Sequence, residues 1–228
     1  MNNKGKFRKS RRGVIGIESA IVLIAFVIVA AALSFVVLNM GFSTTQKAKQ
    51  TIGQGLETSS SVVEVGGSVA GHLNATAGAL DVLTIPLKVA SGSNNVDLQE
   101  SLTAVRYFTK SLNYDNIYNG TLSSTTYSSV SDALAAAVTA GILDENPLAA
   151  ANAANPSETV AIIYWTVNEN NNDVLDKSES ATLAIVFRNA DMPEQLDTLT
   201  TEVVPSIGSP MTVSRDVPTL TDTYQDLT

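Results

Sequence analysis

Between Ala20 and Met40 the chain has 21 consecutive residues, of which only Ser34 and Asn39 are polar. As an α-helix rising about 1.5 Å per residue, this run is long enough to cross the hydrocarbon core of a bilayer. Its surface is apolar all round, so every side of the helix needs lipid or another helix against it. The remainder of the 228-residue chain is rich in Ser, Thr and Asn and must fold as a separate unit.

Six basic side chains and no acidic one lie within residues 1–13. Positive charge stays on the cytoplasmic side, so the N-terminus is predicted inside and the residues beyond Phe42 outside. A secretory signal is cleaved after its apolar segment, whereas here the small residue Gly13 precedes it. A cut at this point removes a basic leader and leaves the apolar helix in the mature protein. The alternative is a signal-anchored membrane protein that keeps its leader.

The charge and residue content exclude several functions. Without residues 1–13 the chain has 8 basic and 22 acidic side chains, a net charge of −14, which repels nucleic acid. There is no cysteine, so an exported domain must rely on its core, on a bound metal or on assembly. With one histidine, and with neither a phosphate-binding loop nor a nucleophile signature, the sequence indicates that the protein is not an enzyme.

The fold class predicted is α+β, a long hydrophobic N-terminal helix followed by an antiparallel, immunoglobulin-like β-sandwich. Ile52 and Leu56 continue the helical spacing, and Gly66-Gly67 predicts the end of the helix. The domains are then a leader (1–13), a helix (14–65) and a head (66–228). In the head, turn signals separate short apolar runs, as in a sandwich. Strands are predicted at 82–89, 97–109, 159–167, 181–188, 202–204 and 211–217, a helix at 132–143, and irregular chain at 113–131.

The run Arg11-Arg12-Gly13-Val14-Ile15-Gly16-Ile17-Glu18-Ser19-Ala20 resembles the N-terminus of archaeal flagellins (archaellins), which belong to the type IV pilin-like superfamily. The likeness continues to Asn39-Met40-Gly41-Phe42. Near the C-terminus, Val204-Pro205-Ser206-Ile207-Gly208-Ser209-Pro210-Met211-Thr212-Val213 resembles the closing strand pair of that family. The resemblance implies cleavage between Gly13 and Val14, a filament core of packed N-terminal helices, and an outward-facing head.

This resemblance implies a structural subunit that polymerises into the archaellum, the swimming filament of archaeal cells. The expected partners are copies of the chain in an open helical polymer, together with related archaellins, a prepilin-peptidase-like leader peptidase and a membrane export and motor platform. The filament is expected to be extracellular, and the precursor to lie in the cell membrane. Two alternatives remain open: an adhesive pilin of the same superfamily, and a membrane-anchored binding protein.

Glu18 is an acidic residue next to the apolar run, four positions after the proposed new N-terminus. A carboxylate in hydrocarbon is costly unless it is paired. One interpretation pairs it with the free ammonium of Val14 on an adjacent subunit, which would fix the axial register. The other leaves it at headgroup level, where the helix dipole favours negative charge.

The segment from Asn168 to Glu179 has the spacing of a calcium-binding loop. Its predicted oxygen ligands are Asn168, Asn170, Asn172, Val174 (through its carbonyl), Asp176 and Glu179. Asp173 stands where such loops have Gly and would need a left-handed backbone. The alternative is a hairpin loop in which Asn side chains bond the nearby backbone. No cofactor is required by this sequence; a structural calcium ion is the one predicted.

Two triplets, Asn74-Ala75-Thr76 and Asn119-Gly120-Thr121, predict N-glycosylation of Asn74 and Asn119. His72 is interpreted as a residue of the surface or of the junction between helix and head. Tyr164, Trp165 and Phe187 lie in the two most apolar runs and are predicted to be core residues.

Overall fold

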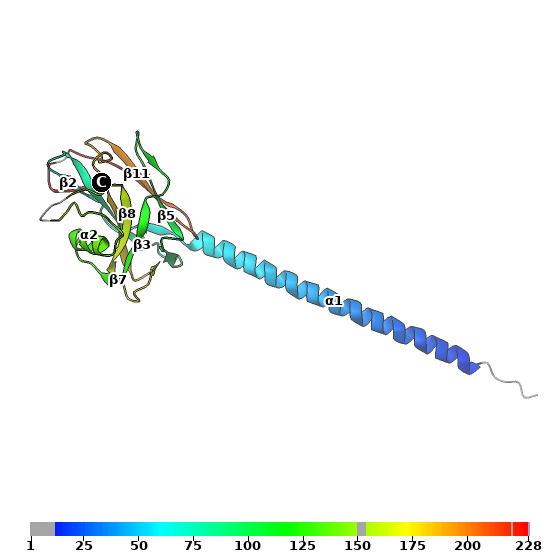
Figure 1. The fold of residues 1–228 in the computed structure, drawn as a ribbon. Coiled ribbons are helices and arrows are strands. Elements are labelled where there is room, and N and C mark those ends of the chain that lie inside the picture. Colours follow the sequence, from blue (N-terminus) through cyan, green and yellow to red (C-terminus); the bar gives the residue numbers. More distant parts are fainter. Residues whose placement is uncertain (1–11, 150–153, 220, 228) are drawn as a thin grey trace, which may run out of the picture. The chain divides into compact units, whose positions relative to one another are not determined.

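The computed structural model describes residues 12–149, 154–219 and 221–227, with the side chains of residues 12–15 and of Glu57 left out. The chain forms two compact units that meet between Gln54 and Gly55. The first contains most of helix α1 (Arg12–Ser60), and the second, here called the head, contains the last turn of α1 and all the strands (Figure 1). Residues 1–11 of the predicted leader lie outside the described part.

Helix α1 is continuous for 49 residues. Ala, Val and Ile dominate its first half; Ala is the best helix former, and the β-branched Val and Ile lower the helix propensity only slightly. Its hydroxyl groups bond back to the helix itself: Ser34 Oγ donates to the Ala30 carbonyl and Thr44 Oγ1 to the Met40 carbonyl, each at 2.8 Å. The hydroxyl hydrogens of these two residues are therefore paired within the helix.

The predicted continuation of the helix to residue 65 is wrong. The helix ends at Ser60, and Val63–Val65 forms strand β1, which pairs antiparallel with β3 (Ala79–Val89). β-branched valines alternate here with Glu64, a pattern that suits a half-buried strand better than a helix. Gly66-Gly67 marks the end of this strand instead of the end of the helix.

The segment Ser60–Val62, here called the neck, is held by two turns of the head. Ser60 O accepts the Asn94 N–H at 3.0 Å, and Val62 O accepts the Ala90 N–H at 2.9 Å. From the other turn, Ser209 N–H donates to Ser61 O at 3.0 Å. The last helical carbonyls and the chain that follows them thus find backbone partners, as buried polar groups require.

The larger sheet of the head has the strand order β13-β2-β3-β10-β8-β7, with β1 also paired to β3. All its pairs are antiparallel except β7 with β8. The strands not yet given are β2 (Ala70–Asn74), β7 (Tyr118–Thr126), β8 (Val160–Val167), β10 (Ser180–Val186) and β13 (Tyr224–Asp226).

The smaller sheet has the order β12-β11-β5-β6, and all its pairs are antiparallel. Its strands are β5 (Thr103–Phe108), β6 (Asn113–Tyr114), β11 (Thr198–Pro205) and β12 (Met211–Asp216). A separate short pair joins β4 (Val96–Asp97) to β9 (Val174–Leu175). The predicted antiparallel sandwich is confirmed in outline, with one parallel strand pair added to it.

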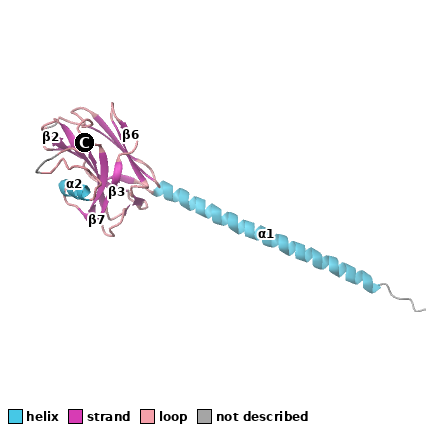
Figure 2. Cartoon of the chain, viewed as in Figure 1, coloured by secondary structure: helices cyan, strands magenta, loops and turns pink. Residues whose placement is uncertain are grey.

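The two sheets enclose the main core, and helix α2 (Val130–Thr139) covers the outer face of the larger sheet (Figure 2). Alternate residues of β8 show this: Ile163 and Trp165 belong to the core between the sheets, whereas Ile162 and Tyr164 belong to the cluster with α2. A strand that is buried on both faces has a continuous run of apolar residues in its sequence. That is why these strands were the clearest in the sequence.

The predictions for Tyr164, Trp165 and Phe187 are confirmed, since all three are buried. The predicted helix at 132–143 is also present, but it begins two residues earlier, at Val130, and ends four residues earlier, at Thr139. Ser129 caps it, because its hydroxyl accepts the Asp132 N–H at 3.1 Å.

Two strand predictions are wrong. The predicted strand 97–109 is broken at Gln99, whose carbonyl accepts the N–H groups of both Leu102 and Thr103 in a tight turn. The segment 113–131, expected to be irregular, contains β6 and β7. In β7 Tyr118 and Leu122 are buried at the sheet edge, while the polar residues between them conceal the alternation.

Pro86 lies within the central strand β3, although proline in sheets is usually confined to edges and bulges. On one side of β3 the partner changes from β2, which pairs as far as Thr84, to β1, which pairs from Leu87. The Pro86 carbonyl accepts the Gly66 N–H on this side. The nitrogen of Pro86, which carries no hydrogen, points to the same side of β3 as its carbonyl, where the neighbouring strand changes. Proline therefore removes no hydrogen bond of the sheet at this position.

Candidate assembly surface

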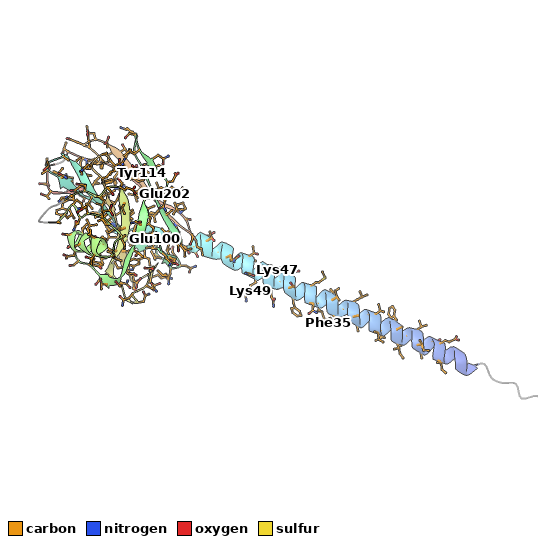
Figure 3. All side chains as sticks on the ribbon, in the orientation of Figure 1. Phe35, Lys47, Lys49, Glu100, Tyr114 and Glu202 are labelled. Atoms are coloured by element: carbon orange, nitrogen blue, oxygen red, sulfur yellow. The ribbon has the colours of Figure 1, made fainter. Side chains whose placement is uncertain are left out.

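The apolar half of α1 is uncovered. Its described large apolar side chains, among them Ile21, Phe26 and Phe35, are between 52% and 73% exposed (Figure 3). Residues 16–60 form one helix long and apolar enough to cross a membrane by length and composition, and none of its most apolar window is buried. Soluble monomers rarely expose contiguous apolar surface of this extent, so the helix is a surface for association with lipid or with other helices.

The second half of α1 has a narrower apolar stripe. Phe42, Ile52 and Leu56 share one face at helical spacing and are each more than 60% exposed. Lys47 and Lys49 are exposed in the same stretch. The surface thus changes along the helix from apolar all round to a stripe bordered by polar groups.

Gly13 and Val14, the predicted cleavage position, lie in the first turn of α1. The helix was predicted to begin at residue 14, and in the structure it begins two residues earlier, at Arg12. Glu18, the predicted register residue, is exposed on the same helix. In one chain no second copy is present, so the pairing of Glu18 with a neighbouring N-terminus stays a prediction.

The predicted calcium loop connects β8 to β10 and is closed by its own hydrogen bonds. Oδ1 of Asn168 accepts the N–H groups of Asn170 and Asn171, at 3.2 and 2.8 Å. The buried carboxylate of Glu179 accepts the Glu169 N–H at 2.9 Å through one oxygen and the Asp176 N–H at 3.1 Å through the other. The hairpin-loop alternative accounts for all of these contacts.

Two further observations bear on the metal. The left-handed residue of the loop is Asn171, with φ 55°, and not Asp173 as expected. Within the described ranges no group of three or more His, Cys, Asp or Glu side chains could hold a metal ion. One observation favours a metal: Oδ1 of Asp173 and Oδ1 of Asp176 are buried without a hydrogen-bond partner in the described part of the chain. The loop therefore offers two free carboxylate oxygens, while Glu179 already serves the backbone.

The two glycosylation candidates differ in their surroundings. Asn74 ends β2 at a hairpin turn, where its Oδ1 accepts the N–H groups of Thr76 and Ala77, and Thr76 is exposed. Asn119 lies within β7, and its side-chain nitrogen donates to the Ile142 carbonyl. The nitrogen that would be modified is thus already bonded at Asn119, whereas the described hydrogen bonds of the Asn74 side chain involve only its oxygen.

The sequence analysis missed two buried carboxylates in the head. Asp81, 2% exposed, accepts a 2.6 Å hydrogen bond from Nδ1 of His72, which lies in β2 and not at the junction with the helix. Burial raises the pKa of Asp81 above its ordinary value, and the contact with His72 offsets only part of this. The apolar residues on both sides of Asp81 in the sequence could have indicated that this carboxylate is buried.

Asp191, also buried, links the two sheets. Its Oδ2 accepts hydrogen bonds from the Thr159 and Tyr114 hydroxyls at 2.7 Å and from Arg188 Nε at 2.8 Å. Burial alone raises the pKa of Asp191, but these three donors outweigh it and hold the pKa below its ordinary value. These partners lie up to 77 positions apart in the chain, so no local pattern could reveal the group.

Comparison with known proteins agrees with this geometry. The family model described as archaeal-type flagellin matches residues 13–215. A probable flagellin 1 of Aeropyrum pernix is 39% identical over 213 residues, which are 92% of this chain and 94% of that protein. Among solved structures, the archaeal flagellum of Methanospirillum hungatei has a TM-score of 0.60 at 20% identity, with 93% of this chain and 99% of that chain covered.

Archaeal flagellin FlaB1 from Methanocaldococcus jannaschii has a TM-score of 0.57 at 18% identity and covers 73% of this chain and 96% of that chain. At these low identities the two structures support the fold, a long helix followed by a β-sandwich.

Proposed function

The chain belongs to the archaeal-type flagellin family, and we propose that it is the precursor of a filament subunit whose helix α1 forms the core and whose head forms the outer layer. As a member of this family it is a structural protein of the archaellum. Its proposed role is mechanical: it transmits rotation along the filament and performs no chemistry itself.

The observation that supports this role best is the uncovered apolar surface of α1. Fully burying a large apolar side chain stabilises by roughly 1.5–3 kcal/mol, and the helix exposes many of them in succession. Lipid can cover them in the precursor. Outside the membrane, only further apolar helices can do so. Copies of α1 are therefore the proposed cover in the filament, in a head-to-tail arrangement that yields an open helical polymer.

We propose that residues 1–13 are removed before assembly. The six cations of this segment would hold the N-terminus of the precursor on the cytoplasmic face, with the head outside. Cleavage between Gly13 and Val14 by a membrane peptidase would release the helix from that anchor. An export and motor platform in the membrane is the proposed partner for the next step, and the finished filament is extracellular.

Glu18 is the proposed register residue. After cleavage it lies four positions from a new, positively charged N-terminus, and helices packed side by side would bring this carboxylate to the Val14 ammonium of a neighbour. An ion pair in an apolar core is favourable only when both charges are matched, so the pairing would select one axial stagger.

A calcium ion in the loop Asn168–Glu179 is a further proposal, supported by the buried, unpartnered Oδ1 atoms of Asp173 and Asp176. The test is the thermal unfolding of sheared filaments in calcium and in a chelator. The emission of Trp165, which is the one tryptophan and lies in the core of the head, reports on this unfolding. Calcium should raise the unfolding temperature of wild type and leave Asp176→Asn unchanged. If the unfolding curves of wild type in calcium and in the chelator are equal, the loop binds no stabilising calcium ion.

We propose Asn74 and Asn119 as glycan positions, with Asn74 the more fully occupied because the side-chain nitrogen of Asn119 is already bonded to the Ile142 carbonyl. Intact-mass measurement of filament subunits decides this. Asn74→Gln should remove the larger share of the added mass.

The N-terminus of the subunit in filaments sheared from cells tests the proposed function itself. Mass spectrometry should find a chain that begins at Val14 and no chain that begins at Met1. If the sheared material lacks the protein and membranes hold it uncleaved, the membrane-anchored binding protein becomes the correct interpretation. Swimming of cells with these filaments, against attachment without swimming, separates the archaellin from the adhesive pilin.

A further inference from the structure

The two units of the chain differ sharply in charge. Residues 55–228 contain 21 acidic and six basic side chains, a net charge of −15. Residues 14–54 contain one acidic residue, Glu18, and two basic ones, Lys47 and Lys49. After removal of the leader, the side chains of the helical unit therefore carry a small net positive charge, and its two basic side chains lie within three consecutive positions.

Among the described residues, neither lysine has a carboxylate partner in its own chain. Four ion pairs occur in this part of the structure, and all of them lie in the head. The positions three and four residues away from Lys47 and Lys49 are uncharged, so helical i, i+4 pairing is impossible. The nearest acidic residue in the sequence, Glu57, is eight positions beyond Lys49, or about 12 Å along the helix axis.

Both lysines border surfaces that the filament would cover. Lys49 shares a face with Phe42, Ile52 and Leu56, the apolar stripe of the second half of α1. Lys47 lies two positions away, about 200° around the helix, and so faces the opposite side (Figure 3). When neighbouring subunits pack on this part of α1, both ammonium groups lose water and need a counter-charge.

We propose that Lys47 and Lys49 bind carboxylates on the heads of two neighbouring copies of the chain, and so join the helical core to the outer layer of the filament. This rests on the proposed function, because it needs assembled subunits. Charge favours the head as the partner: it has an excess of 15 negative charges, whereas a neighbouring helix α1 offers only two carboxylates, Glu18 and Glu57. Such contacts would also orient each incoming head, since complementary charge favours one approach over others.

The test compares filaments of wild type, the double variant Lys47→Gln/Lys49→Gln and the matched control Lys110→Gln. Lys110 is an exposed lysine of the head without an ion pair among the described residues, so its loss changes charge without touching the proposed contact. The temperature at which sheared filaments dissociate is measured by light scattering at low salt and at about 1 M salt, where the Debye length falls to about 3 Å.

The double variant should dissociate several degrees below wild type at low salt, and the difference should vanish at high salt. Lys110→Gln should behave as wild type. The proposal is overturned if the double variant and wild type share one salt profile. It is also overturned if Glu18→Gln lowers the dissociation temperature of wild type at low salt but not that of the double variant, because the lysines would then pair with Glu18 of a neighbouring helix.

Two further measurements distinguish the proposed contact from a folding defect of the head and from a role of the lysines in the membrane. Trp165 emission of each variant should match wild type, which shows that the head has folded. The amount of precursor in membranes should also match; a loss there would place the lysines at lipid headgroups and overturn the proposal. If wild-type filaments contain the chain from Val14 but the salt profiles coincide, this inference fails while the proposed function stands.

Discussion

Replacement of Gly208 by Ala should open the neck. Gly208 has φ +118°, a backbone conformation that residues with a side chain rarely adopt, and a Cβ at this position would lie 2.3 Å from the Ser61 carbonyl oxygen. The chain must shift, and the hydrogen bond from Ser209 N–H to Ser61 O is lost with it. Backbone strain of about 1–3 kcal/mol and about 1 kcal/mol for the hydrogen bond predict a loss of roughly 2–4 kcal/mol.

The assay is denaturant unfolding of the full chain in detergent micelles, followed by Trp165 emission. This residue is fully buried in the head, so its signal reports on the head and not on α1. Gly78→Ala is the matched control. Gly78 also has a positive φ, +66°, but nothing lies within 4 Å of a Cβ there, so only about 1–2 kcal/mol should be lost. Equal losses in the two variants would refute the account of the neck, because the close approach to Ser61 would then have no energetic weight.

Other predictions concern the buried carboxylates and one strained residue. Burial raises the pKa of Asp81, so the stability that Asp81 contributes is fully present below its ordinary pKa of 3.8 and is lost as the pH rises through its pKa in the folded protein. As the pH rises from about 3 to about 7, Asp81→Asn should therefore gain stability relative to wild type. The pKa of Asp191 is lowered, so the stability that Asp191 contributes is present above pH 3.8 and is lost as the pH falls through its pKa in the folded protein. As the pH rises over the same interval, Asp191→Asn should lose stability relative to wild type. Changes of the same sign in the two variants would contradict both assignments. Leu196 has φ +69° and is 74% exposed, so Leu196→Gly should raise the unfolding free energy by about 1 kcal/mol, and a decrease would show that its side chain makes a stabilising contact.

The helix and the central strands could be predicted because their signals are local. An apolar run of 21 residues allows few structures, and β8 and β10 are continuous apolar runs because one face packs on the smaller sheet and the other on α2. The end of α1 could not be predicted. Ser60 is the last helical residue because two turns of the head bond the neck, and the bonded residues of these turns lie 28 to 34 and 148 positions away.

The polar strand β7 shows a second limit. Its polar sequence predicts a loop. It forms a strand because β8 provides a parallel pairing partner at the edge of the sheet. Pro86 shows the reverse case: a residue that disfavours a central strand is tolerated where the neighbouring strand changes from β2 to β1. In both cases the tertiary partner overrides the local preference.

The candidate sites follow the same division. The assembly surface of α1 could be predicted, since it needs only the pattern of one helix. The loop Asn168–Glu179 has calcium spacing in the sequence, yet the structure uses Glu179 to bond the backbone of Glu169 and Asp176. Spacing alone does not determine the direction in which a carboxylate faces.

The central claim is that copies of α1 cover the apolar half of α1 in the filament. The chain has no cysteine, so Leu33→Cys places a single thiol in the middle of that surface, at a side chain that is 61% exposed in one subunit. The rate at which a maleimide labels this thiol in intact sheared filaments, and again after their dissociation in detergent, tests the claim directly. We expect protection of the thiol in the filament and rapid labelling after dissociation; equally rapid labelling in both states would show that copies of α1 do not cover this surface.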